Sequence, residues 1–211
     1  MIFLGKELIF PDVETADPEG IVAIGGDLSP ERLILAYRSG IFPWYNEGEP
    51  IIWYSPDPRM VLYPKKLKIS KSMRSVLNSK KFKITYNQHF EEVVANCKTI
   101  SRKDQPGTWI TDEMQKAYVE LHQMGIAKSV EVWQNKKLIG GLYGIDLGHI
   151  FCGESMFSKV SNASKTAFIH LVQKCESKNY KLIDCQVYND HLASLGAEEI
   201  LRKNFMKVLK S

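Results

Sequence analysis

The sequence predicts an α+β fold in two parts, a small N-terminal domain over residues 1–60 and a larger domain over residues 61–211. The first part is rich in Pro, Gly and aromatic residues and has little periodic pattern. The second part carries alternating apolar patterns in close succession, which indicate an antiparallel meander, and apolar residues at helical spacing beside them. The chain of 211 residues, of which 44% are hydrophobic, is long enough to bury a sizeable core.

One helix is predicted in the N-terminal domain, from Pro30 to Gly40. Ser29 precedes it as an N-cap, Pro30 occupies its first turn, and Gly40 ends it. Leu33 and Tyr37 lie on its apolar face. The rest of this domain is predicted to be loop, and it needs the larger domain to pack against.

The larger domain is predicted to be built from helices at residues 112–124, 162–175 and 202–209 and strands at residues 129–133, 138–145, 150–157 and 180–187. Residues 135–137 form a turn between the first two strands. Asn162 is the expected N-cap of the middle helix, and Gly125 ends the first one. The strands before the middle helix form the meander, and the last strand joins the sheet after it.

The charge of the chain is unevenly distributed. Its 28 Lys and Arg and 24 Asp and Glu residues give a net charge of +4. Residues 64–83 carry eight basic residues and no acid, which leaves 20 basic and 24 acidic residues, a net charge of −4, over the other 191 residues. The eight basic residues are Lys65, Lys66, Lys68, Lys71, Arg74, Lys80, Lys81 and Lys83. This basic tract indicates a polyanionic partner, and a solvated Lys-rich helix and loop is the alternative.

Several classes of function find no support in the sequence. No basic region with a long apolar run opens the chain, and no window has the roughly 20 apolar residues of a membrane span, so we expect a cytoplasmic protein without a membrane partner. The 4 Cys and 5 His are scattered without metal-binding or redox spacing, which predicts reduced thiols and no metal. The Gly pairs at residues 25–26 and 140–141 form neither a P-loop nor a dinucleotide fingerprint, so no nucleotide cofactor is expected.

Short blocks along the chain resemble one enzyme family, in the same order. They are Val22–Leu33, Gly40–Trp44, Trp53–Arg59, Gly107–Thr111, Gly153–Ser158, Asn162–Lys165 and Leu182–Gln186. Together they make the chain similar to the leucyl/phenylalanyl-tRNA–protein transferases from about residue 10 to about residue 209.

The resemblance implies a fold, a reaction and partners. The larger domain is expected to be GNAT-like, with a mainly antiparallel sheet. The enzyme is expected to move Leu or Phe from aminoacyl-tRNA to the N-terminal α-amine of proteins that begin with Arg or Lys, which marks them for degradation. Because the tRNA ester is already activated, no cofactor is implied. The expected partners are aminoacyl-tRNA and these proteins, and the chain is expected to act as a monomer.

Three polar residues are the candidate catalytic group. Glu154 lies in an apolar strand, where a carboxylate is costly unless it is paired or solvated, so the residues alone make it a candidate. Asp184 and Gln186 are two apart on a strand and share a face. The resemblance makes them the pair that handles the amine. Because a neutral amide is a very poor base, we expect Gln186 to orient the amine or relay its proton, and Asp184 to favour loss of that proton. Water or the tRNA ester could take that proton instead, and a strand-end pair that completes a turn is the structural alternative.

The resemblance also implies residues that bind the donor. Trp44 is expected to stack on the terminal adenine at the tRNA 3′ end, and Trp109 matches another Trp at the family's site. The alternative for both is that they are simple core aromatics. The apolar socket for the donor's side chain is expected from Leu142, Phe151, Met156, Phe168, Leu171 and Ile183, each of which is otherwise an ordinary core residue. The basic tract is expected to contact acceptor-stem phosphates. Lys128 stands where the family often has His, and no role is assigned to it.

Two other functions fit parts of the pattern. An acyl-CoA-dependent GNAT enzyme would need a loop that starts with Gln or Arg and holds the CoA pyrophosphate, and the sequence has no such motif. A tRNA-binding module without catalytic activity would keep the basic tract. The joint presence of Glu154, Asp184 and Gln186 argues against that module.

Overall fold

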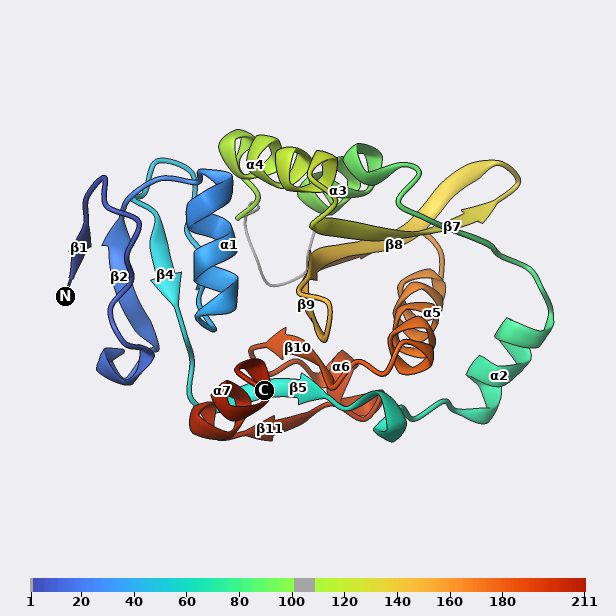
Figure 1. Cartoon of the computed structure of the whole chain (residues 1–211). Coiled ribbons are helices and arrows are strands. Elements are labelled where there is room, and N and C mark those ends of the chain that lie inside the picture. Colours follow the sequence, from blue (N-terminus) through green and yellow to red (C-terminus); the bar gives the residue numbers. More distant parts are fainter. Residues whose placement is uncertain (1, 101–108) are drawn as a thin grey trace.

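The computed structural model describes residues 2–100 and 109–211. Gly107 and Thr108, which belong to one of the family-like blocks, lie outside the described residues. The N-terminal part contains a small sheet whose strands lie in the order β1 (Phe3–Leu4), β2 (Ile21–Gly25), β4 (Ile52–Tyr54) and β3 (Phe42–Pro43). Beside it lie a short 3-10 helix, η1 (Val13–Thr15), and α1 (Pro30–Arg38), as Figure 1 shows for α1.

A larger sheet forms the centre of the molecule. Its strands lie in the order β11 (Glu198–Ile200), β5 (Arg59–Leu62), β10 (Leu182–Gln186), β9 (Ile150–Ser158), β8 (Lys137–Asp146), β7 (Ala127–Gln134) and β6 (Lys83–Tyr86). β9 and β10 pair in parallel, and the other neighbours pair antiparallel. The predicted α+β class with a mainly antiparallel sheet is thereby confirmed.

Helices cover both faces of this sheet (Figure 1). α3 (Phe90–Thr99) and α4 (Asp112–Gln123) pack on one face of β7 and β8, and α5 (Ala163–Ser177) packs on the other. The remaining helices are η2 (Pro64–Lys66), α2 (Lys71–Asn78), α6 (Asp190–Ser194) and α7 (Arg202–Leu209). Two buried apolar clusters result, one on each side of the sheet.

The elements predicted from periodicity are present, with ends that differ by a few residues. The N-terminal part was expected to be loop apart from α1, and this is wrong because it also contains the four strands of the small sheet. The sequence patterns also did not indicate α2, α3 and α6, or the strands β5, β6 and β11 of the larger sheet. The three strands have only three or four residues each, which is too short for a two-residue period to stand out. β5 is nevertheless central to the site, because it lies between β10 and β11.

Both expected side-chain caps are wrong in detail. The Ser29 hydroxyl donates to the carboxylate of Asp27 and makes no cap hydrogen bond to α1. Asn162 precedes α5 in a left-handed conformation, with φ 70°, and its side chain does not cap the helix. The hydroxyl oxygen of Ser158 instead accepts a hydrogen bond from the Ser164 N–H at 3.3 Å. Each helix begins as predicted, but α1 has no side-chain cap from Ser29, and in α5 the Ser158 hydroxyl takes the place of the expected cap.

The N-terminal part shares a core with the larger one. Val22 and Leu33 belong to the same buried cluster as Phe90, Tyr118 and Phe157. The loop-rich start of the chain therefore packs against helices and strands that follow it, as its composition predicted. This packing brings α1 to the edge of the site described next.

Candidate active site

A cavity of about 610 Å³ lies where the small sheet, β9, β10, α5 and α6 meet. Most of the predicted site residues line it, and they are Trp44, Trp109, Leu142, Glu154, Met156, Phe168, Leu171, Ile183, Asp184 and Gln186. Phe151, which was also expected in the socket, does not line it. Phe151 lines a second cavity of about 170 Å³, and Leu171 contributes to both cavities. The structure thus brings together all three candidate catalytic residues and five of the six socket residues.

A β-bulge on β9 positions Glu154. Tyr143 and Gly144 are consecutive on β8, but their partners on β9 are Ser155 and Gly153. Glu154 is therefore the extra residue of a bulge, which bends the strand and redirects its side chain. A Cβ on Gly144 would lie 2.1 Å from a backbone oxygen of β9, so this close approach requires glycine.

A second bulge, on β10, positions Gln186. Asp184 pairs with Val61 and Gln186 pairs with Met60, so Cys185 is the extra residue. Gln186 adopts φ 66°, and its backbone N–H donates to Asp184 Oδ1 at 3.0 Å. The parallel pairing of β9 and β10 reaches no further than Asp184. Beyond it the strands separate, and the main cavity occupies the space that opens between them.

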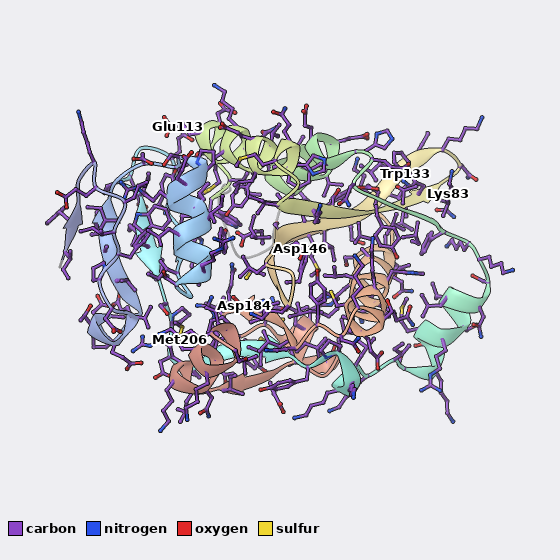
Figure 2. All side chains as sticks on the ribbon, viewed as in Figure 1. Lys83, Glu113, Trp133, Asp146, Asp184 and Met206 are labelled. Carbon is purple, nitrogen blue, oxygen red and sulfur yellow. The ribbon has the colours of Figure 1, made fainter. Side chains whose placement is uncertain are left out.

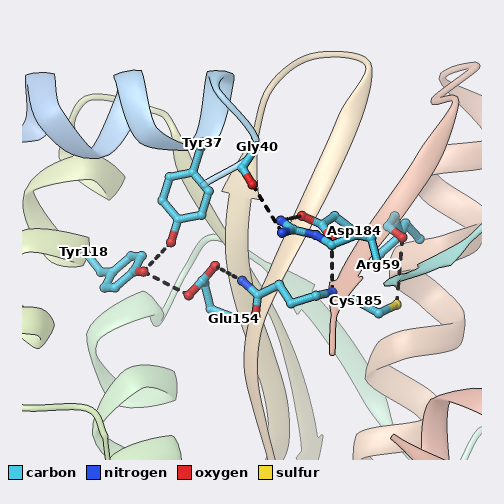
Figure 3. Close-up of polar contacts among 9 residues, drawn as sticks. Tyr37, Gly40, Arg59, Tyr118, Glu154, Asp184 and Cys185 are labelled. Atoms are coloured by element: carbon cyan, nitrogen blue, oxygen red, sulfur yellow. Dashed lines mark hydrogen bonds and ion pairs between the residues drawn. The ribbon is translucent and has the colours of Figure 1, made fainter. Parts of the chain in front are cut away.

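Hydrogen bonds from two elements converge on the half-buried carboxylate of Glu154, and a third element supports one of them (Figure 3). Gln186 Nε2 donates to Glu154 Oε1 at 2.9 Å. The Tyr118 hydroxyl on α4 donates to Glu154 Oε2 at 2.9 Å, and it is also hydrogen-bonded to the hydroxyl of Tyr37 on α1. The carboxylate is thus fixed in orientation while it lines the cavity.

Glu154 is poised between its two protonation states near neutrality. Removal of the carboxylate from bulk water raises its pKa from 4.5 to about 7, and the negative charge of Asp184 acts in the same direction. Hydrogen bonds from Tyr118 and Gln186 oppose the rise because they favour the ionised form. A carboxyl group with this pKa can both accept and return a proton at neutral pH.

The raised pKa of Glu154 predicts a stability that depends on pH. Between its unfolded value of 4.5 and about 7, the unfolded state binds fewer protons than the folded state. The wild-type protein should therefore lose stability as pH rises through this window, by up to about 3 kcal/mol. Glu154→Gln removes the ionisable group, so its free energy of unfolding should exceed the wild-type value above pH 7 and approach it near pH 4.5. Urea unfolding measures both values, and a difference that stays constant with pH would contradict the prediction.

Asp184 is buried in a bidentate ion pair. Arg59 of β5 donates from Nε to Asp184 Oδ1 at 2.8 Å and from Nη2 to Oδ2 at 2.7 Å. Arg59 Nη1 also donates to the Gly40 carbonyl at 3.2 Å, and its guanidinium lies 4.8 and 4.6 Å from the ring centres of Phe42 and Phe205. The charge expected to act on the amine is thus already compensated by Arg59, as Figure 3 shows.

Sequence reasoning missed three residues of this network. Tyr37 and Tyr118 lie on apolar helix faces and look like ordinary core residues. Only one signal could have marked them as part of a polar network, namely that a buried hydroxyl needs a hydrogen-bond partner. Arg59 begins the apolar run of β5 and is 1% exposed. A base next to such a run requires a buried anion, and this signal could have led to Asp184.

The two Trp residues expected at the tRNA 3′ end belong to the same cavity. Trp44 and Trp109 are half-buried and line it. The ring centres of Trp44 and Tyr54 are 5.9 Å apart. The cavity therefore has aromatic surface in its lining as well as apolar side chains, as base stacking requires.

The basic tract runs over η2, α2 and β6, and its eight basic side chains are all exposed. Lys66 pairs with Glu198, and the other seven have no ion pair among the residues that the structure describes. In Figure 2, Lys83 lies beside Trp133 at one end of the molecule, whereas Asp184 lies near its middle. The tract is thus a separate surface from the cavity lining.

Neither a metal site nor a membrane-spanning helix was expected from the sequence, and both can be looked for in the residues that the structure describes. Within residues 2–100 and 109–211, no cluster of three His, Cys, Asp or Glu side chains could hold a metal ion. In the same part of the chain, no helix has the length and apolar character needed to cross a bilayer.

The cavity joins an apolar socket to a carboxyl group whose pKa lies close to neutrality. In an α+β domain, this combination defines an enzyme site suited to the transfer of an apolar acyl group with acid–base assistance. Comparison with known protein families identifies the family to which this enzyme belongs. The profile described as leucyl/phenylalanyl-tRNA protein transferase matches residues 61–210, and that of its N-terminal domain matches residues 26–57. The chain belongs to this family and is an aminoacyltransferase.

Curated relatives are similar over the whole chain. The leucyl/phenylalanyl-tRNA–protein transferase of Flavobacterium johnsoniae is 67% identical over 211 residues, which cover 100% of both chains. That of Christiangramia forsetii is 58% identical over 99% of this chain and 100% of its own. Among solved structures, a GCN5-related N-acetyltransferase from Kribbella flavida is similar with a TM-score of 0.36 and 11% identity, over 78% of this chain and 58% of that chain.

Proposed function

We propose that this chain transfers Leu or Phe from aminoacyl-tRNA to the N-terminal α-amine of proteins that begin with Arg or Lys. The observation that carries the proposal is Glu154, a carboxyl group with a pKa near 7 at the mouth of an apolar socket. The donor's side chain occupies the socket, its terminal adenine stacks on the Trp44 side, and the acceptor's amine approaches Glu154. The peptide bond formed marks the acceptor for degradation.

The reaction is aminolysis of an ester. The neutral α-amine, with an ordinary pKa of about 7.7–8.0, attacks the ester carbonyl carbon. Glu154 accepts the proton that the amine loses and returns it to the ribose oxygen that leaves, so the carboxylate is restored. The Gln186 amide donates to Glu154 and leaves its own carbonyl oxygen to orient the amine N–H. Positioning of the two reactants supplies much of the remaining rate enhancement.

Asp184 acts through structure in this mechanism. Its carboxylate binds Arg59 on one side and the backbone N–H of Gln186 on the other. The pair therefore fixes the bulge from which Gln186 reaches Glu154. We assign Asp184 and Arg59 as positioning residues, and Glu154 and Gln186 as the residues that contact the amine.

The socket supports a choice of donor by shape. Leu142, Met156 and Leu171 are unbranched at Cβ, and Met adapts readily to different occupants. Such a socket fits both Leu and Phe, whereas β-branched side chains are excluded by their shape. Discrimination of about 1–3 kcal/mol per methylene is the most that apolar contact alone provides.

The deciding experiment mixes the protein with charged Leu-tRNA and a peptide that begins with Arg. We expect Leu at the peptide's N-terminus, and none on a matched peptide whose first residue is acidic. If tRNA binds but Leu never reaches the Arg peptide, the chain is a tRNA-binding module and the proposal fails. Transfer from an acyl-CoA in place of the tRNA would likewise overturn it.

The basic tract predicts a salt-dependent contact with tRNA. Changing Lys65, Lys66, Lys68 and Lys71 to Glu should weaken tRNA binding and flatten its dependence on salt, because fewer counterions are released. Transfer from an aminoacyl-adenosine fragment, which lacks the tRNA body, should stay unchanged. Filter binding over a salt series measures the slope, and an unchanged slope would mean that the tract is only a solvated surface.

A further inference from the structure

The second cavity, of about 170 Å³, lies where the C-terminal end of α5 meets β6, β7 and β8. Lys128, Lys174 and Lys178 line it, together with Tyr86, Asp146 and Tyr180. Leu171 separates it from the main cavity, because this side chain lines both. None of the residues that contact the amine lines it, so the proposed reaction leaves the site unexplained.

Three ammonium groups converge here with little compensation. Lys128 comes from β7, Lys174 lies in the last turn of α5, and Lys178 follows directly after that helix, four residues further on. Over the described residues, none of the three takes part in an ion pair. Asp146 is the acid in the lining, and its Oδ1 already accepts hydrogen bonds from the Tyr180 hydroxyl at 2.5 Å and the Gly148 N–H at 2.8 Å.

Lys174 is the most constrained of the three. Its side chain is half-buried, and its Nζ lies 3.7 Å from the centre of the Tyr86 ring. Burial lowers the pKa of Lys174, and the nearby charges of Lys178 and Lys128 lower it further. A bound anion would relieve this repulsion, since an opposite charge favours the ammonium form.

The basic tract connects this cavity with the main one. At its start, the Lys68 N–H donates to the Leu195 carbonyl directly after α6, and α6 carries His191 and Leu192 of the main cavity. At its end, β6 begins at Lys83 and runs along the sheet edge to Tyr86 in the second cavity. The exposed bases therefore form a path from the rim of one cavity to the other.

We propose that the second cavity binds a backbone phosphate of the aminoacyl-tRNA and extends the contact made by the basic tract; this inference rests on the proposed function. Lysines act as point charges on phosphate and carry no information about sequence. The cavity contributes affinity for any tRNA body and takes no part in the choice of amino acid.

The test compares two triple variants that remove the same charge. The site variant changes Lys128, Lys174 and Lys178 to Gln. The control changes to Gln three exposed lysines in and directly after α7 that line neither cavity, namely Lys203, Lys207 and Lys210. We expect the site variant to bind tRNA about three- to tenfold more weakly and its salt slope to fall by about 0.7–0.9, the value of one phosphate contact. The control should keep the wild-type slope. A thermal melt of each variant establishes that it is folded.

Four further results separate the possibilities. Transfer from the aminoacyl-adenosine fragment should be the same in the wild type and the site variant. If the wild type fails to transfer Leu from any donor, the proposed function fails, whatever the slopes are. If the site variant keeps the wild-type slope, the second cavity binds no tRNA phosphate, and the inference falls. Inorganic phosphate could also stabilise the wild type but not the site variant, while both proteins show the same salt slope for tRNA binding. In that case the cavity binds a free anion, and the inference is overturned as well.

Discussion

Glu154→Gln is expected to lower kcat for Leu transfer by roughly 10²–10⁴-fold, the usual contribution of a positioned general base. The amide keeps the size of the side chain and can still accept from Gln186 Nε2, so the socket and its KM for aminoacyl-tRNA should be nearly unchanged. A loss confined to kcat identifies an interaction made in the transition state. Single-turnover transfer to an Arg peptide measures this split.

The pH profile gives a second readout of the same variant. In the wild type, the rate should rise with pH through the pKa of Glu154, about 7, and then through that of the acceptor amine. In Glu154→Gln only the rise that belongs to the amine should remain. A profile identical to that of the wild type would mean that Glu154 is not the group that accepts the proton.

A second buried acid provides the matched control. Glu131 is fully buried in β7, where the hydroxyls of Ser129 and Thr85 each donate to its carboxylate at 2.5 Å. It does not line the main cavity. Glu131→Gln should therefore leave kcat unchanged, although it alters a carboxylate that is more deeply buried than the half-buried Glu154. A loss of rate as large as that of Glu154→Gln would attribute both effects to the fold.

The helices and strands of the larger domain followed from periodicity because each contains enough residues to show an apolar face. β8 and β9 have ten and nine residues, and α5 has fifteen. β5 has four residues and was not indicated, although it supplies Arg59. Its place in the sheet depends on long-range pairing with β10 and β11, which no local pattern encodes.

The same limit applies to the site. Glu154 could be proposed from the sequence because an acid in an apolar strand is costly. The two bulges could not be predicted from the sequence, since each arises from a mismatch in register between neighbouring strands. These bulges set the direction of the Glu154 and Gln186 side chains. Asp184 was expected to act on the amine because its ion pair with Arg59, 125 residues away, cannot be seen in the sequence.

Arg59→Met is expected to lower the free energy of unfolding by about 3–5 kcal/mol, because it leaves Asp184 buried without its partner. This is a large part of the roughly 5–15 kcal/mol that holds an ordinary protein together. The Gly40 carbonyl also loses its donor, which loosens the contact of the N-terminal part with β5. Urea unfolding of the wild type and the variant measures the change. Arg59→Lys should recover only part of the loss, since an ammonium group cannot form the bidentate pair.

A double-mutant cycle tests whether the loss of stability in Arg59→Met arises from the uncompensated charge of Asp184. Asp184→Asn should also destabilise the protein, since it leaves the Arg59 charge buried, while its side-chain oxygen can still accept from the Gln186 N–H. In the double variant Arg59→Met with Asp184→Asn, neither charge remains, so the destabilisation should be clearly smaller than the sum of the two single effects. Because the bulge at Gln186 keeps its backbone contact, the double variant should also regain part of the transfer rate that Arg59→Met loses. Strictly additive effects on stability would mean that the two charges do not depend on each other, and the positioning role assigned to the pair would then be wrong.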